Sequence, residues 1–209
     1  MPTIDISLKD LNNLIGKELT LKEFEDKAAL FVKGELDGVD EDTLKVDCKD
    51  SNRPDLWSTE GMARVIAPKY TEETGIREYE VTPSEVYLHV DRSVDEVRPY
   101  IVAAIVKDVK ISENLLIQMI QLQEKVCLTF GRKRKTVAMG LYDFDKMTPP
   151  LTYKAFKPTE LSFTPLEGKK EQTLKDILRT HPKGIEYAHL LKDAKRYPII
   201  IDSKKVVAS

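Results

Sequence analysis

A run of cations, Gly131–Lys135 (GRKRK), is the strongest local feature of this sequence with a chemical use. It places Arg132, Lys133, Arg134 and Lys135 directly after a segment with helical periodicity. Such groups suit contact with the phosphate oxygens of a nucleic acid. Cations also complement the partial negative charge at a helix C-terminus, which explains the run without any ligand. Both interpretations stay open on composition alone.

The other reactive side chains do not gather into a known catalytic pattern. Asp143 and Asp145 lie two positions apart, so on a strand they would share one face, although a solvated strand end explains them more simply. The three histidines, His89, His181 and His189, are too scattered for a metal site. The two cysteines, Cys48 and Cys127, form no CxxC pair and are expected to be buried small hydrophobes. The chain also lacks the GxxxxGK[ST], GxSxG and HExxH motifs.

The overall composition is that of an ordinary water-soluble protein. The chain has 209 residues, 41% hydrophobic and 33% charged, and its net charge of −2 arises from 33 basic and 35 acidic residues. Without a basic excess, any contact with nucleic acid must be local or made by a larger assembly. No apolar run of ~18 residues is present, and the start MPTIDISLKDL does not resemble a secretory signal. We therefore expect no membrane contact and a cytoplasmic location.

Clear start and stop signals divide the first half into short elements. Gly16 should end a first helix, and Thr20 with Glu23 forms a capping-box pattern that should open a second. Asn52 should cap a further helix that has Pro54 in its first turn. The expected strands cover 3–7, 32–36 and 44–48, and the expected helices cover 8–15, 21–31 and 52–66.

The polar stretch Thr71–Pro83 predicts a domain boundary near residue 85. Beyond it, the segment Ser112–Thr129 has apolar residues spaced by three and four, which predicts a helix capped by Ser112. Shorter patterns predict helices over 173–179 and 185–191 and strands over 86–90, 100–109, 136–142, 151–156, 198–202 and 206–208. The expected class is α+β, with two domains.

Several segments together resemble phenylalanyl-tRNA synthetase beta subunits of the archaeal and eukaryotic type. DSNRPDLWSTEGMARVI (Asp50–Ile66) is similar to a hallmark of that family, in which Asn-Arg-x-Asp-Leu leads into a helix with Gly-x-Ala-Arg. The later segments resemble its editing domain: Arg98–Tyr100, Gln118–Lys125, Thr129–Arg132, Gly140–Asp145, Phe163–Leu166 and Tyr197–Ser203. The resemblance follows the linear order of nearly the whole chain.

This resemblance implies that residues 1–85 form the N-terminal beta-subunit domain and residues 86–209 an incomplete editing domain. In the family, an alpha subunit charges phenylalanine tRNA within an alpha2beta2 heterotetramer, and the beta subunit hydrolyses tyrosine wrongly attached to that tRNA. A separate site helps because a hydrophobic pocket rejects an added hydroxyl poorly. No cofactor or metal is expected in this fragment, although ATP and magnesium are expected for the whole synthetase.

The resemblance also assigns two pocket residues. Ile200 would supply apolar wall for the aromatic ring, and Ser209 would hydrogen-bond the substrate or a water molecule in a catalytic role. Taken without the family, Ile200 is explained as a buried strand residue and Ser209 as an exposed polar terminus. The family's editing domain continues past this point with further pocket residues, and Ala208 stands where a larger aliphatic residue is usual.

Three classes of function therefore remain possible for this chain. The first is a truncated editing domain that hydrolyses mischarged tRNA. The second is a non-catalytic module that positions tRNA or braces the alpha subunit. The third is an α+β interaction domain unrelated to synthetases. A cavity shared by Ile200 and Ser209 would favour the first class, and a flat surface there would favour the second.

Overall fold

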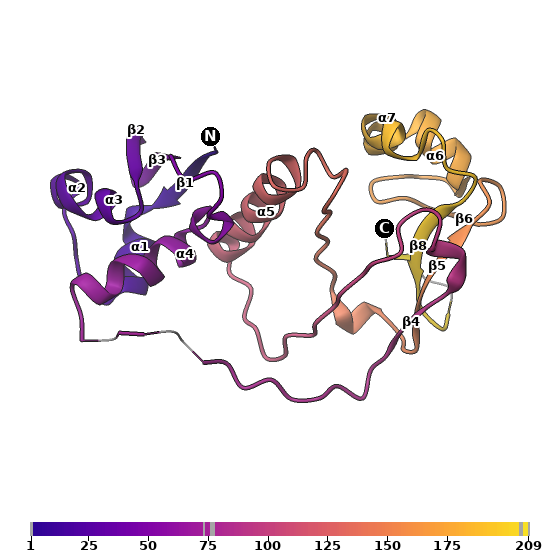
Figure 1. Cartoon of the computed structure of the whole chain (residues 1–209), viewed down its shortest axis with the longest axis horizontal. Coiled ribbons are helices and arrows are strands. Elements are labelled where there is room, and N and C mark those ends of the chain that lie inside the picture. Colours follow the sequence, from indigo (N-terminus) through magenta and orange to yellow (C-terminus); the bar gives the residue numbers. More distant parts are fainter. Residues whose placement is uncertain (1, 73, 76–77, 205–206, 209) are drawn as a thin grey trace. The chain divides into compact units, whose positions relative to one another are not determined.

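The computed structural model describes residues 2–72, 74–75, 78–204 and 207–208 (Figure 1). Contacts divide the chain into an N-terminal unit, residues 1–80 with 109–139, and a C-terminal unit, residues 81–108 with 140–209. Both units contain helices and strands, so the expected α+β composition is confirmed. No helix in the part of the chain that is described is long and apolar enough to cross a membrane.

The N-terminal unit is built on an antiparallel sheet with the strand order β1-β3-β2. The strands are β1 (Thr3–Ser7), β2 (Gly34–Asp40) and β3 (Thr43–Cys48). Isoleucine and valine side chains alternate into the core along β1 and β3, as the period of two in a half-buried strand requires. The expected hairpin of β2 and β3 is present, and β2 is longer than the sequence indicated.

Helix α1 (Leu8–Ile15) has its predicted bounds, α2 (Leu21–Glu23) begins at the predicted signal, and α3 (Ala29–Phe31) ends at the predicted residue. Ser7 caps α1, and Gly16 ends it in the left-handed conformation with φ of 77°. The Thr20–Glu23 capping box forms as predicted. The expected continuous helix to Phe31 is interrupted by a π-helical turn at Phe24–Ala28, which has Phe24 and Ala28 in the core.

The helix expected from Asn52 begins later than predicted. A 3₁₀ turn covers Pro54–Leu56, and α4 (Thr59–Ile66) starts after Ser58, whose hydroxyl accepts from the Gly61 N–H at 3.2 Å. Asn52 therefore caps no helix. Leu56 and Trp57 are buried and lead the chain into the core before α4 can begin.

Helix α5 (Glu113–Leu128) also belongs to the N-terminal unit, although the division at residue 85 placed it in the second domain. Ser112 caps it as expected. Leu122 and Val126 pack against the core, and the amides of Gln118 and Gln121 bond the backbone of Asp5 in β1. The helix was recognisable from local periodicity, but its partner was not. Whether residues 86–209 correspond to an editing domain stays a prediction.

The C-terminal unit contains a mixed sheet with the strand order β4-β5-β8-β9. Its strands are β4 (Leu88–Val90), β5 (Leu151–Phe156), β8 (Tyr197–Ile201) and β9 (Val207–Ala208). β4 pairs with β5 in parallel, whereas β5–β8 and β8–β9 are antiparallel. A small buried cluster joins Tyr153 and Ala155 of β5 to Val94, and Ile200 packs on it.

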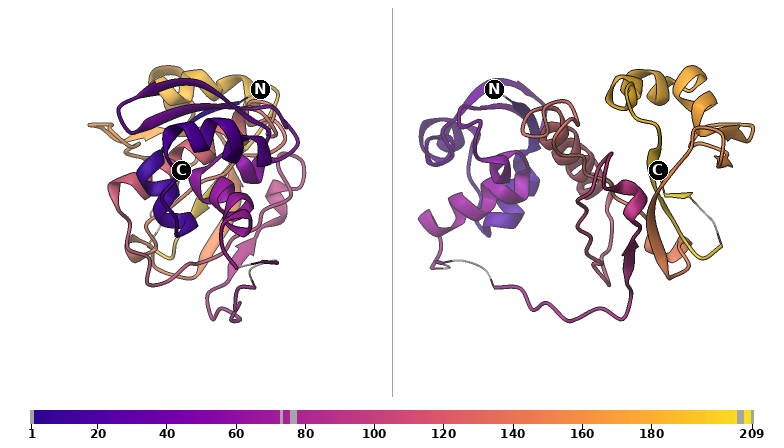
Figure 2. Two further views of the ribbon diagram at one scale, coloured as in Figure 1. Left: turned by 90° about the vertical axis from the view of Figure 1, so that its left-hand side faces the viewer. Right: turned by 45° about the vertical axis from the view of Figure 1, so that its right-hand side comes forward.

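Between β5 and β8 the chain makes a long excursion, residues 157–196, from one end of the sheet (Figure 2). It contains a two-stranded sheet of β6 (Ser162–Phe163) and β7 (Gln172–Thr173), which the sequence did not indicate. Helices α6 (Leu174–Thr180) and α7 (Pro182–Tyr187) follow, with a 3₁₀ turn at Ala188–Leu191. The excursion leaves the sheet after Phe156 and returns to it at Tyr197, and these two residues are paired across β5 and β8.

Two expected strands do not form. Residues 100–109 and 136–142 have no strand assignment, although their alternation favoured one. Val102 and Tyr100 are 98% and 90% exposed, so none of the strands that the structure describes covers this segment. A strand needs a hydrogen-bonded partner, which alternation in one segment cannot specify.

Candidate functional site

The basic run forms a left-handed turn at the end of α5. Arg132, Lys133 and Arg134 have φ values of 49°, 56° and 66°. Each non-glycine residue in this region costs on the order of 1 kcal/mol, so surrounding contacts must hold the turn. The N–H groups of Gly131 and Arg134 donate to the carbonyls of Val126 and Cys127 at 2.7 and 2.8 Å. The turn therefore folds back onto the last residues of the helix.

Gly131 is required at the start of this turn. A β-carbon there would lie 2.3 Å from the Val137 carbonyl oxygen and 2.6 Å from that of Cys127, which are impossible contacts. The Met139 N–H also approaches the buried Cys127 Sγ, at 3.2 Å. The segment after the turn therefore lies against the end of α5.

This geometry exposes the cations unequally. Arg132, Lys133 and Lys135 are exposed, whereas Arg134 is half-buried in the turn. Three positive groups thus stand on the surface beside carbonyls at a helix C-terminus. The arrangement fits both phosphate contact and dipole complementarity, so the assignment of these residues to tRNA binding stays a prediction.

Ile200 lies half-buried in β8, where its backbone pairs with Tyr153 on one side and with Ala208 on the other. Its contact with the cluster of Val94, Tyr153 and Ala155 fixes one side of the residue in the core. Ser209, the expected catalytic residue, lies outside the described residues.

Asp202, which the sequence did not single out, is a buried carboxylate directly after β8. Its two oxygens accept from the Thr148 N–H and the Lys204 N–H, both at 2.9 Å. The Ser203 hydroxyl also donates to the Thr148 carbonyl at 2.9 Å, which adds a bond between the same two segments. These bonds anchor the turn that leads towards β9. A carboxylate within an apolar run was the available sequence signal.

Asp143 and Asp145 do not form a carboxylate pair on a strand. Asp143 accepts from the Asp145 N–H at 3.2 Å, opens a 3₁₀ turn and pairs with Lys146. The solvated, capping explanation is therefore sufficient. No group of three His, Cys, Asp or Glu side chains suited to a metal ion occurs among the described residues.

Both cysteines are free and buried, as expected. The Cys48 thiol donates to the Leu56 carbonyl at 3.7 Å. Burial, with a contribution from the negative charge of Asp47, raises the pKa of this thiol to about 11. Cys48 is therefore a protonated core residue at neutral pH rather than a nucleophile.

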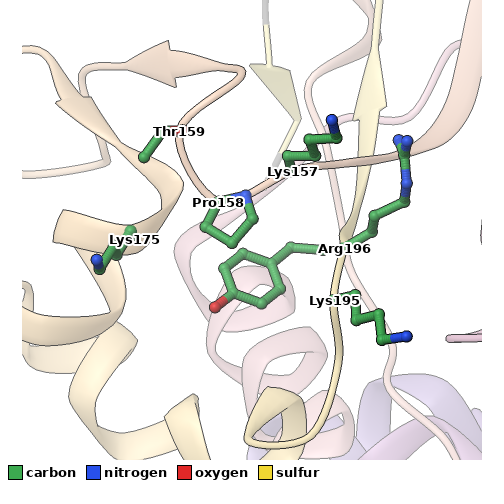
Figure 3. A pocket seen from close by; sticks show the side chains of 7 residues that line it. Lys157, Pro158, Thr159, Lys175, Lys195 and Arg196 are labelled. Carbon is green, nitrogen blue, oxygen red and sulfur yellow. The ribbon is translucent and has the colours of Figure 1, made fainter.

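The C-terminal unit has a basic hollow of about 530 Å³ at the root of the excursion (Figure 3). Its lining combines four cations with an aromatic ring and two small side chains: Lys157, Pro158, Thr159, Lys175, Lys195, Arg196 and Tyr197. Ile200 is not among these residues. Sequence reasoning missed the hollow because its cations come from three separate places in the chain.

No family model matches the chain. It is 50% identical to the phenylalanine–tRNA ligase beta subunit of Pyrococcus horikoshii over 213 residues, covering 100% of this chain and 38% of that protein. The corresponding protein of Methanosphaera stadtmanae is 36% identical over 209 residues, with coverage of 100% and 37%.

A solved structure agrees. The crystal structure of an N-terminal fragment of the phenylalanyl-tRNA synthetase beta subunit from Pyrococcus horikoshii matches with a TM-score of 0.95 and 49% identity. It covers 100% of this chain and 60% of that fragment. The chain belongs to the archaeal-type phenylalanine–tRNA ligase beta-subunit family. The chain spans about 38% of the length of the Pyrococcus horikoshii beta subunit.

The segment that suggested this beta-subunit family has a structural explanation. Arg53 and Asp55 form a two-bond ion pair at 2.9 and 2.7 Å. A β-carbon on Gly61 would lie 1.5 Å from the Asp55 carbonyl oxygen, so only glycine lets α4 pass this turn. Leu56 and Trp57 are core residues. These hallmark residues build the junction into α4 rather than a reaction centre.

Proposed function

We propose that the chain is the N-terminal part of a beta subunit. In this proposal, the second half of the chain, residues 86–209, edits phenylalanine tRNA that carries tyrosine. The observation that carries the proposal is the match over 100% of the chain, at 49% identity and a TM-score of 0.95, to the Pyrococcus horikoshii fragment. An alpha subunit and tRNA are the proposed partners, and the cytoplasm is the proposed location. The reaction is hydrolysis of the ester that joins tyrosine to the tRNA.

In this proposal, β8 supplies one wall of the pocket. Ile200 offers apolar surface to an aromatic ring, and its contacts with Tyr153 and Ala155 keep that surface in place. Asp202 accepts hydrogen bonds from the N–H groups of Thr148 and Lys204 and so anchors the end of β8. Ser209 then orients the substrate or the attacking water. Water is the nucleophile, so no covalent intermediate forms.

A second candidate function is tRNA positioning without hydrolysis. The exposed cations of Arg132, Lys133 and Lys135 favour it, because one hydrogen-bonded turn carries all three exposed side chains. This function and editing are compatible within one subunit. They differ in whether Ser209 and Ile200 affect the rate of ester cleavage.

The decisive experiment uses the full-length beta subunit assembled with its alpha subunit. Ser209→Ala should slow deacylation of tyrosine-charged phenylalanine tRNA by about tenfold or more, as loss of an oriented polar group in a transition state does. Ile200→Phe should act similarly by filling the space for the ring. Phenylalanine charging should stay unchanged, because it is expected on the alpha subunit.

Two results would reject these residue roles. Normal deacylation in both variants would place the pocket elsewhere, and a parallel loss of charging would indicate global damage. Ile200→Val serves as the matched control, since it keeps a β-branched apolar wall and should keep most of the deacylation rate.

A further inference from the structure

The basic hollow at the root of the excursion concentrates positive charge in a chain with no basic excess. Lys157 follows β5, Lys175 lies on α6, and Lys195 precedes β8. All three side chains are exposed. Among the described residues, no carboxylate lies within ion-pair distance of their Nζ atoms. These ammonium groups are therefore available to an external anion.

Hydrogen bonds fix the chain segments that line the hollow relative to one another. The Lys175 N–H donates to the Pro158 carbonyl at 2.9 Å, which fixes α6 against the chain that leaves β5. Arg196 donates to the Ala155 carbonyl at 3.1 Å and so joins the two ends of the excursion. Glu160 accepts from the Lys157 N–H at 2.9 Å and lies 3.8 Å from Arg196.

The shape and lining indicate the class of ligand. In Figure 3, Lys175 and Thr159 lie on one side of Pro158, whereas Lys157, Lys195 and Arg196 lie on the other. A volume of about 530 Å³ falls within the range of small-ligand pockets, ~300–1,000 Å³, and exceeds what a bare phosphate needs. Tyr197 adds an aromatic face on which a base can stack.

We propose that this hollow binds the phosphate backbone of single-stranded RNA, with Lys157, Lys175 and Lys195 contacting phosphates and Tyr197 contacting a base. The choice of RNA rests on the proposed function, in which the partner is a tRNA. The site is separate from Ile200 and from the turn at Gly131–Lys135, because none of these residues lines the hollow.

The first test measures binding of a fluorescent single-stranded oligoribonucleotide to the whole chain over a range of salt concentrations. The triple variant K157A/K175A/K195A should lose affinity at low salt. The slope of log affinity against log salt should fall by about 2, since each contact with single-stranded nucleic acid contributes ~0.7. The matched control K169A/K170A/K204A removes the same charge from exposed positions that do not line the hollow. It should leave the slope nearly unchanged.

Tyr197 is tested by an independent pair of variants. Tyr197→Ala should weaken RNA binding about tenfold without changing the salt slope, because stacking releases no counterions. Tyr197→Phe should bind normally. Circular dichroism on every variant should match that of the unchanged chain, so that loss of binding does not reflect unfolding.

Three outcomes would overturn the proposal. Equal slopes for the two triple variants would mean that only overall charge matters. Millimolar inorganic phosphate that abolishes RNA binding at constant ionic strength would make the hollow a site for free phosphate. Unchanged binding in Tyr197→Ala would remove the stacking contact. None of these readouts involves ester hydrolysis, so the proposed function stands or falls separately.

Discussion

The side-chain amide of Gln118 donates a hydrogen bond of 3.0 Å to the backbone carbonyl of Asp5. The same amide accepts from the Thr59 N–H at 3.3 Å through its oxygen. One buried side chain of α5 therefore joins the first strand and the first turn of α4. Gln121 completes the junction, because its oxygen accepts from the Asp5 N–H at 2.7 Å.

We expect Gln118→Ala to destabilise the chain by about 1–3 kcal/mol, because the N–H of the buried Thr59 loses its acceptor. The Asp5 carbonyl keeps the hydrogen bond that it accepts from Gln121. Urea unfolding followed by fluorescence of Trp57 would measure this change. Gln123→Ala on the same helix is the control and should have an effect below ~0.5 kcal/mol. A loss of equal size in the two variants would contradict the role of Gln118.

Limited proteolysis should cut first within Thr71–Pro83. Glu72, Glu78 and Glu80 are exposed there, so a glutamate-specific protease should act on this stretch before the helices. The two products should stay associated in gel filtration under native conditions, since α5 lies after the cut and is bonded to β1 before it. Products that separate at once would contradict the assignment of α5 to the N-terminal unit.

Replacing Arg132, Lys133, Arg134 and Lys135 by alanine should weaken binding of phenylalanine tRNA and reduce its salt dependence. The reason is that a protein with fewer phosphate contacts releases fewer counterions from the tRNA when it binds. A variant with Arg and Lys exchanged at these positions keeps the charge and should keep the slope. An unchanged slope in the alanine variant would identify the turn as a solvated helix end.

The Cys48 thiol makes stability sensitive to alkaline pH. Its folded pKa of about 11 lies above the ordinary thiol pKa of 9.0, so the unfolded chain loses the proton first as pH rises. Its contribution is fully present below pH 9 and is lost as pH rises through about 11. Cys48→Ala should therefore show a smaller fall in unfolding free energy between pH 9 and 11. An identical fall in both proteins would mean that other groups cause it.

Local signals were sufficient for much of the N-terminal unit. Gly16 and the Thr20–Glu23 box fix their helix ends through contacts within a few residues, so the sequence displays them directly. The exposed 100–109 segment shows the limit of this approach. Its alternation is typical of a strand, yet pairing depends on a partner strand that the local sequence does not specify.

The candidate sites divide in the same way. The cations of the basic turn are consecutive and could be found by inspection, but their left-handed backbone could not. Lys157, Lys175 and Lys195 are far apart in the sequence, and only the pairing of Phe156 with Tyr197 brings two of them together. Ile200 was named through family resemblance alone, since an apolar strand residue carries no signal of its own.

The pairing of Phe156 with Tyr197 also makes the excursion a replaceable module. Because residues 157–196 leave and return at adjacent positions, a two-residue hairpin turn could close β5 onto β8 directly. Insertions within the excursion would cost the sheet little, since loop-closure entropy rises by only about 0.6 kcal/mol for each doubling of length. This stretch is therefore a place where a tag or a second RNA-binding element can be grafted without breaking the pairing of β5 with β8.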